Sequence, residues 1–269
     1  MNQPRPCPYC GSTDARIRFL EPPFRVVKCS NCSLVYLANP PDESGIYEQY
    51  HERAHFDVRQ YSRDSDDPSL AELFAINTQR ISALKELKTS GTLLDIGCGR
   101  GAFLKTAADN GYSAEGIDVS QNAIVCAQNE LHVNAKVDTL ENIASSGSHF
   151  DIVTLWHVLE HFSDPFKSMK LVRSLLNEVG VCILEVPNLH SLKFMVSRRK
   201  WEGGNHPRYH RTFFTHQTLR RGLQKAGFSK VRRLKLTYHV PNRGASYEAL
   251  KQMLNCVAMD AFLMFVAQK

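Results

Sequence analysis

The segment that most constrains the fold lies at residues 93–104 and reads LLDIGCGRGAFL. A short apolar run that carries an acid is followed by three glycines within five residues. The apolar run is typical of a buried strand, and the glycines permit a tight turn in which the backbone approaches a ligand closely. Residues 101–111, GAFLKTAADNG, then have the spacing of a helix. The segment therefore predicts a strand, a ligand-binding turn and a helix, in that order.

The alternation of strand-like and helix-like patterns continues along most of the chain. Strand patterns occur at residues 92–97, 113–120, 134–138, the start of 150–162, and 181–188. Helical patterns occur at residues 70–87, 101–111, 121–131 and 164–180, the last with Asp164 as its cap and Gly180 just past its end. This repetition predicts an α/β fold, with a parallel sheet covered by helices on both faces. Because ligands of such sheets bind beyond the carboxyl ends of the strands, the residues after each strand are the candidate site residues.

A second signal comes from four of the eight cysteines, which form a C-x2-C-x18-C-x2-C pattern near the start of the chain. Each pair can hold an ion from one side, and two strand-like runs around Pro22 and Pro23 supply the hairpin between them. We predict a zinc ribbon at residues 1–40, with iron as the alternative metal. Four thiolates leave no open coordination position, so the zinc should be structural. The predicted ligands are Cys7, Cys10, Cys29 and Cys32.

The composition is that of a globular chain with a mild basic excess. Lys and Arg number 33 against 27 Asp and Glu, which permits an anionic small-molecule substrate or RNA. The charges form no concentrated basic stripe of the kind that a dedicated nucleic-acid binder carries. No run of about 18 apolar residues predicts a membrane span, and the first residues lack a signal core, so we expect a cytoplasmic location. Residues 41–70 are predicted to form a Tyr-rich linker or lid.

The ligand of the glycine-rich turn can be inferred from two acids. Gly97, Gly99 and Ala102 also satisfy a loose dinucleotide fingerprint, whereas the absence of Gly-Lys-Ser/Thr excludes a Walker loop. Asp95 at the end of the first strand would repel a pyrophosphate and favour a cationic group. Asp118 at the end of the second strand can accept the hydroxyls of a ribose. A ligand with a ribose and a cationic group but no phosphate is S-adenosylmethionine.

With these features the chain resembles the class I S-adenosylmethionine-dependent methyltransferases. The resemblance rests on LLDIGCGRG (93–101), GIDVS (116–120) and FDIVTLWHVLEHFSDP (150–165). It implies a Rossmann-like, seven-stranded, mostly parallel sheet over residues 71–269, closed by an antiparallel strand from the tail DAFLMFVAQK. It also implies the cofactor-binding set. Asp95, Gly97, Cys98 and Gly99 would line the methionine part, Asp118 the ribose, Val119 and Asp138 the adenine, and Trp156 and His157 the surroundings of the sulfonium.

The ribbon and the Tyr-rich linker carry a narrower resemblance. Chains with these parts ahead of a methyltransferase domain resemble enzymes of sugar, polysaccharide or natural-product pathways, some of which act on nucleotide-linked sugars. The resemblance implies a small anionic acceptor. Two alternatives stay open: an RNA-base methyltransferase whose ribbon holds RNA, and a non-catalytic binding protein. The sequence leaves the oligomeric state and the methylated atom open.

The acceptor should lie under a long insertion at residues 188–215, at the binding edge of the sheet. Its arginines could hold phosphates by paired hydrogen bonds, and a histidine could act as the base that activates a nucleophile. The predicted substrate-binding residues are Arg198, Arg199, Trp201, Arg208 and Arg211. The predicted catalytic residues are His210 and His161, followed by Tyr209 and His206.

Overall fold

The computed structural model describes residues 5–41, 68–197, 209–236, 238 and 245–269. They include a seven-stranded sheet in the order β10-β11-β8-β7-β4-β5-β6. Paired neighbours in this sheet run parallel except at β11, which is antiparallel to both β10 and β8. The sheet confirms the predicted fold class, including the antiparallel strand from the tail. Its strands are β4 (Thr92–Ile96), β5 (Ser113–Asp118), β6 (Ala135–Val137), β7 (Phe150–Trp156), β8 (Leu176–Pro187), β10 (Lys230–Leu234) and β11 (Phe262–Gln268).

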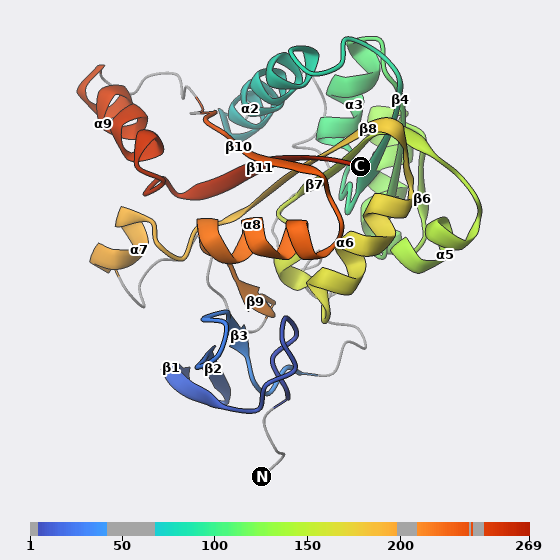
Figure 1. Cartoon of the computed structure of the whole chain (residues 1–269). Coiled ribbons are helices and arrows are strands. Elements are labelled where there is room, and N and C mark those ends of the chain that lie inside the picture. The colour runs from blue at the N-terminus through green and yellow to red at the C-terminus, as the bar shows by residue number, and fades with distance from the viewer. Residues whose placement is uncertain (1–4, 42–67, 198–208, 237, 239–244) are drawn as a thin grey trace.

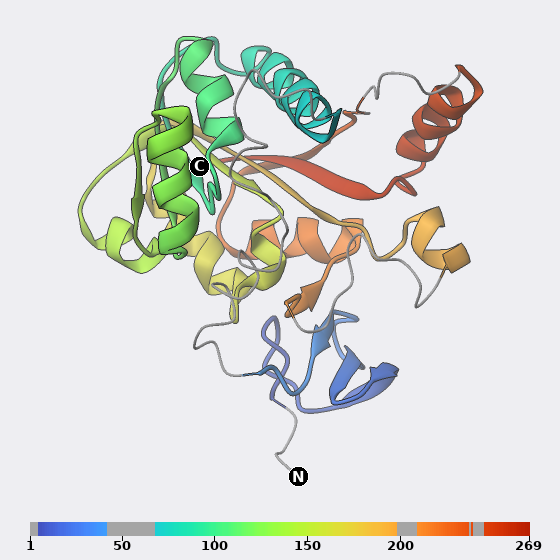
Figure 2. The same cartoon turned by 180° about the vertical axis from the view of Figure 1, so that it is seen from behind.

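Helices cover both faces of this sheet (Figures 1 and 2). The cause is the pleat, which sends successive side chains to opposite faces. Leu93 and Ile152 pack in one apolar cluster with α2 and α3, whereas Leu94 and Val153 pack in another with α5, α6 and α8. The helices are α2 (Pro68–Lys85), α3 (Ala102–Asp109), α4 (Gln121–Leu131), α5 (Leu140–Ser145), α6 (Pro165–Ser174) and α8 (His216–Lys225).

Helix α6 begins where the sequence predicts and ends earlier. The Asp164 carboxylate accepts hydrogen bonds from two backbone N–H groups of the first turn. The helix ends at Ser174, so the prediction that it continues to the residue before Gly180 is wrong. Leu176 is fully buried and pairs with Phe150 at the start of β8. Burial of this leucine in the sheet outweighs the weak helix preference of the sequence around it.

The N-terminal segment forms a separate antiparallel sheet of β1 (Ala15–Glu21), β2 (Phe24–Cys29) and β3 (Val35–Leu37). Its fourth strand is β9 (Thr212–Phe213), which comes from the far end of the insertion. Val35 pairs with Phe213 and Tyr36 pairs with Thr212. Figure 1 shows β9 descending from the main body to the edge of the N-terminal sheet. The insertion therefore completes the sheet of the cysteine-rich segment, a pairing that no local sequence pattern indicates.

Side-chain contacts also hold the N-terminal segment to the main body. The rings of Tyr9 and Phe166 of α6 meet edge to face with centroids 5.0 Å apart. The Leu37 N–H donates to the carbonyl of Arg211 at 3.0 Å, next to the β3–β9 pairing. Buried residues of the N-terminal sheet and of the large sheet belong to one apolar cluster. The two parts therefore share a core.

The remaining described elements lie outside the main layers. The short 3-10 helix η2 (Leu159–His161) follows β7, α7 (Leu192–Ser197) follows β8, and α9 (Ala245–Cys256) precedes β11. None of the described helices has the length and apolar character that crossing a membrane requires.

Candidate functional site

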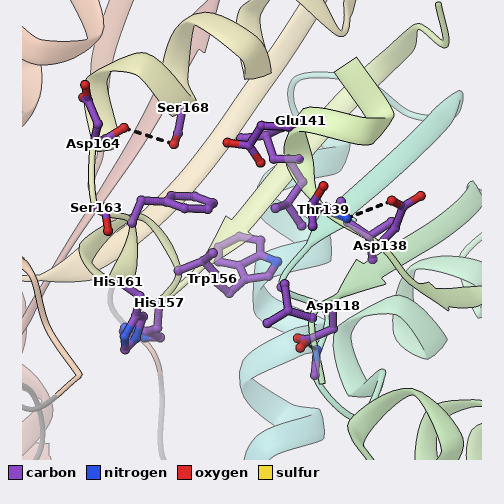
Figure 3. Close-up of a pocket in the computed structure, with 18 of the residues that line it drawn as sticks. Asp118, Asp138, Thr139, Glu141, Trp156, His157, His161, Ser163, Asp164 and Ser168 are labelled. Carbon is purple, nitrogen blue, oxygen red and sulfur yellow. Dashed lines mark hydrogen bonds between the residues drawn. The ribbon is translucent and has the colours of Figure 1, made fainter. Parts of the chain in front are cut away.

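A cavity of about 540 Å³ lies beyond the carboxyl ends of β4, β5, β6 and β7, where the fold predicts a ligand. Residues of the glycine-rich turn, η2 and the first turns of α5 and α6 form its walls. In Figure 3, Trp156 stands in the middle of this site, with Asp118 on one side and His157 and His161 on the other. The lining includes Ile96, Gly97, Gly99, Asp118, Val119, Asp138, Thr139, Trp156, His157, His161, Lys167 and Tyr209.

The glycine-rich turn is held in a backbone conformation that other residues rarely adopt. Gly97 has φ +70° and Gly99 has φ +52°. A Cβ built on Gly97 would lie 2.4 Å from a methyl of Val158, whereas one built on Gly99 would meet nothing within 4 Å. The first glycine is therefore required by close packing as well as by its dihedral angle. The second glycine leaves room at the cavity wall.

Asp118 is hydrogen-bonded to the glycine-rich turn and lies on the cavity wall. Its Oδ2 accepts the Gly99 N–H and its Oδ1 accepts the Ser120 N–H, both at 2.9 Å. Each carboxylate oxygen has two lone pairs, so the group can accept further hydrogen bonds from a ligand in the cavity. Asp118 is 8% exposed and lies on the cavity wall. This position fits the predicted ribose contact, which stays a prediction.

Asp95 is buried beneath the turn and does not reach the cavity wall. The Thr154 hydroxyl donates to its Oδ1 at 2.6 Å. Loss of solvation on burial raises the pKa of Asp95 to about 7, although the Thr154 hydrogen bond and the charge of Arg80 oppose that shift. Its charge therefore depends on what occupies the space above it, and a cationic ligand would stabilise the carboxylate.

Trp156 is held by a buried network that the sequence analysis missed. Glu185 accepts hydrogen bonds from Arg80 at 2.6 Å, from His157 at 2.9 Å and from Tyr238 at 2.5 Å. The Arg80 guanidinium lies over the Trp156 ring, 4.2 Å from its centre. The burial of Glu185 would raise its pKa, but its three partners lower that pKa to about 2. The only sequence signal was an acid within the otherwise apolar run VCILEVPN.

The histidines gather on the other side of the cavity. His161 Nδ1 lies 3.0 Å from the carbonyl oxygen of Tyr209, and the Arg211 N–H donates to the Glu160 carbonyl at 2.7 Å. These two hydrogen bonds fasten the end of the insertion to η2. The rings of His161 and His210 meet edge to face with centroids 4.8 Å apart. The structure thus brings together three of the predicted catalytic residues, His161, Tyr209 and His210.

The predicted substrate-binding residues are placed less completely. Arg211 is 2% exposed, and its guanidinium donates to the carbonyl of Pro41 at 2.9 Å, on the side of the N-terminal sheet. Its predicted contact with substrate stays a prediction. Arg198, Arg199, Trp201, His206 and Arg208 lie outside the described residues.

The four N-terminal cysteines form one cluster. Cys7 Sγ lies 3.5 Å from Cys32 Sγ, and Cys10 Sγ lies 3.6 Å from Cys29 Sγ. All four sulfurs lie within 4.8 Å of one another. A tetrahedral zinc ion with bonds of about 2.3 Å holds its sulfurs about 3.8 Å apart, so the cluster fits zinc. These four residues would hold the ion, and the closed shell would serve the fold.

The model of a methyltransferase-domain family matches residues 69–233, which are more than half of the chain and include the whole cavity wall described above. The chain belongs to this family. Among its curated relatives are ubiquinone biosynthesis O-methyltransferases. The Coxiella burnetii protein is 30% identical over 115 residues, which cover 40% of this chain and 49% of the relative. The Cereibacter sphaeroides protein is 32% identical over 110 residues, which cover 39% of this chain and 44% of the relative.

The chain spans about half the length of the curated relatives that it matches. Solved structures extend the likeness of the fold. A SAM-dependent methyltransferase from Archaeoglobus fulgidus has a TM-score of 0.55 at 18% identity and covers 85% of this chain and 100% of its own. Magnesium protoporphyrin IX methyltransferase from Synechocystis, solved with bound SAH, has a TM-score of 0.57 at 16% identity. The match covers 83% of this chain and 98% of the Synechocystis chain. The likeness to these solved structures confirms the predicted fold.

Proposed function

We propose that this chain transfers a methyl group from S-adenosylmethionine to a small anionic metabolite, a sugar-linked or nucleotide-linked acceptor. The observation that carries the proposal is the two-sided cavity. Asp118 and the glycine-rich turn line the side suited to an adenosyl group, and His161 lines the other side with Tyr209. A methyl donor and an acceptor can therefore meet within one enclosure.

The donor side has the groups that an adenosyl sulfonium requires. Asp118 would accept the ribose hydroxyls, and Asp138 on the same wall would accept from the adenine amino group. The buried indole N–H of Trp156 has no acceptor among the described residues, so it can donate to a bound ligand. Methyl transfer is an in-line displacement, and these contacts would fix the sulfonium methyl towards the acceptor.

The acceptor side has the groups that an anionic nucleophile requires. Lys167 on the cavity wall supplies positive charge. His161 lies on the cavity wall with the His210 ring against it, and either imidazole would serve as the base that activates an acceptor hydroxyl. A bound zinc ion in the four-cysteine cluster would stabilise the N-terminal sheet and, through β9, the position of His210.

The acceptor class can be tested with S-adenosylmethionine labelled on its methyl group. The full chain is incubated with a panel of nucleotide sugars and, separately, with cellular RNA. We expect label in the small-molecule fraction. Label in RNA alone would contradict the proposed acceptor, and label in neither, with cofactor binding intact, would contradict it as well.

The donor site is tested by Asp118→Ala. Loss of hydrogen bonds to a charged group should weaken S-adenosylmethionine binding by about 1–3 kcal/mol in calorimetry. Asp109→Ala on the exposed end of α3 is the matched control and should bind as the wild type does. An unchanged affinity of Asp118→Ala would remove the ribose assignment.

A further inference from the structure

We propose that Glu160, His161 and His210 bind a divalent transition-metal ion, in a second metal site separate from the four cysteines. The inference deepens the proposed function and rests on it, because the ion would face the acceptor side of the same cavity. One oxygen of Glu160 and one nitrogen from each histidine lie within 4.8 Å of one another. Two imidazoles and a carboxylate are a common ligand set for zinc and similar ions.

The spacing of the ligand atoms suits an ion better than a hydrogen bond. His161 Nε2 lies 4.0 Å from Glu160 Oε1, which is too long for a direct hydrogen bond. Ligands bonded to one ion at about 2.1 Å lie roughly 3.0–4.2 Å apart. The three ligand atoms would therefore have to move only slightly closer together to bind one ion.

The state of His161 favours the same conclusion. A carbonyl oxygen only accepts hydrogen bonds, so His161 Nδ1 must donate to Tyr209. In the neutral ring, Nε2 then carries its lone pair on the side of the Glu160 carboxylate. That lone pair is the one through which a neutral histidine binds a metal ion. An N–H donated to a backbone carbonyl is also the usual way in which metal-binding histidines are oriented.

Glu160 is the buried acid that such a cation would bind. It is 1% exposed, and neither of its carboxylate oxygens has a hydrogen-bond partner among the described residues. His157 Nδ1 is 3.7 Å from Oε1, also beyond hydrogen-bonding distance, and its Nε2 is occupied by Glu185. A buried carboxylate without hydrogen bonds is costly, and a directly bound ion would remove that cost.

The third ligand is brought to the site by the fold. His210 lies between Tyr209 and Arg211, whose backbone groups are bonded to His161 and Glu160. The next residues form β9, which is fixed against β3. His210 is therefore held from both sides before any ion binds.

Three protein ligands leave coordination positions open, and His161 is the ligand that lines the cavity. An acceptor hydroxyl that reached such a position would lose its proton to solvent more easily, because a divalent cation lowers the pKa of a bound hydroxyl. The two histidines would then act on the acceptor through the ion. This role differs from direct proton abstraction and has a separate experimental signature.

The test uses Co²⁺ as the probe. The full chain is first saturated with zinc at the cysteines, and Co²⁺ is then added while the visible spectrum and the bound metal are measured. We expect one further ion per chain, with the weak bands of nitrogen and oxygen ligands and without the strong near-ultraviolet band of cobalt thiolates. The absence of a further ion, or a thiolate spectrum only, would overturn the proposal.

Glu160→Gln and His210→Gln should lose this cobalt signal, whereas the matched control His149→Gln on an exposed loop should keep it. Retention of the signal in both site variants would overturn the proposal. If either variant fails to fold, anomalous scattering from Co²⁺ in wild-type crystals locates the ion directly, and density away from these three side chains would overturn the site. A chain that transfers methyl groups without the second ion would contradict this inference while leaving the proposed function intact.

Discussion

At the scale of single residues, position after a strand is the most informative property. Asp118 could be singled out from the sequence because it ends a recognisable strand beside the glycine-rich turn. Glu185 could not, because an acid within an apolar strand gives no indication of its partners. Arg80 and Tyr238, which bond to it, come from segments 105 and 53 residues away. Contacts of that kind depend on tertiary packing, which a local pattern does not encode.

Asp95 gives a pH-dependent prediction at this scale. Burial raises its pKa to about 7, so in the ligand-free protein the carboxyl is increasingly neutral below that pH. A cationic cofactor binds more tightly when Asp95 is an ionised carboxylate than when it is a neutral carboxyl. The affinity for S-adenosylmethionine should therefore rise with pH up to about 7, by at most about tenfold per pH unit, and level off above it.

Calorimetry from about pH 6 to pH 8 checks this expectation. Asp95→Asn keeps the shape of the side chain and removes the titration, so the variant should lose that part of the pH dependence. Asp109→Asn on exposed α3 should keep it. If cofactor affinity changed equally with pH in the wild type and in Asp95→Asn, the ionisation of Asp95 would not govern cofactor binding.

At the scale of elements, patterns with local causes were predictable. Helix α4 matches its predicted residues 121–131, and Asp164 caps α6, as the sequence indicated. The end of α6 and strand β9 were not predictable. Both depend on a partner strand far along the chain, Phe150 in one case and Val35 in the other.

The turn between β4 and α3 gives the prediction at this scale. An alanine at Gly97 or Gly99 would be strained by about 1–2 kcal/mol because of the positive φ. Only Gly97→Ala would also collide with Val158. Urea unfolding should therefore show a larger loss of stability for Gly97→Ala than for Gly99→Ala.

Val158→Ala provides the control. Combined with Gly97→Ala, it should recover part of the lost stability, because it removes the methyl that the new Cβ meets. Equal stability of the two glycine variants, or strictly additive losses in the double variant, would contradict the packing explanation.

At the scale of the whole molecule, the cysteine cluster and the histidine cluster are joined by one strand. Zinc at the cysteines would hold β3, β3 pairs with β9, and β9 directly follows the segment that carries His210. The cysteine cluster was predicted from its spacing, and His161 and His210 were predicted as catalytic residues without any indication that their rings meet. Their connection could not be predicted, because a two-residue strand has no periodic pattern.

This connection predicts separable effects of a ribbon variant. Cys10→Ser removes one thiolate and should lower methyl transfer strongly, because His210 loses its support, while changing cofactor affinity little. Cys126→Ser, a half-buried cysteine of α4 outside the cluster, is the matched control and should leave both quantities near wild type. Kinetics with labelled cofactor and calorimetry measure the two quantities. A parallel loss of cofactor affinity in Cys10→Ser would point to general unfolding instead.

The four-stranded sheet that β9 completes also has a consequence for folding during synthesis. Residues 35–37 leave the ribosome early, but the strand that covers their open edge is encoded at residues 212–213. During synthesis this edge stays unpaired until most of the main body has emerged. Nascent chains halted before residue 212 should therefore expose an unpaired strand edge that is prone to aggregation and that chaperones would bind.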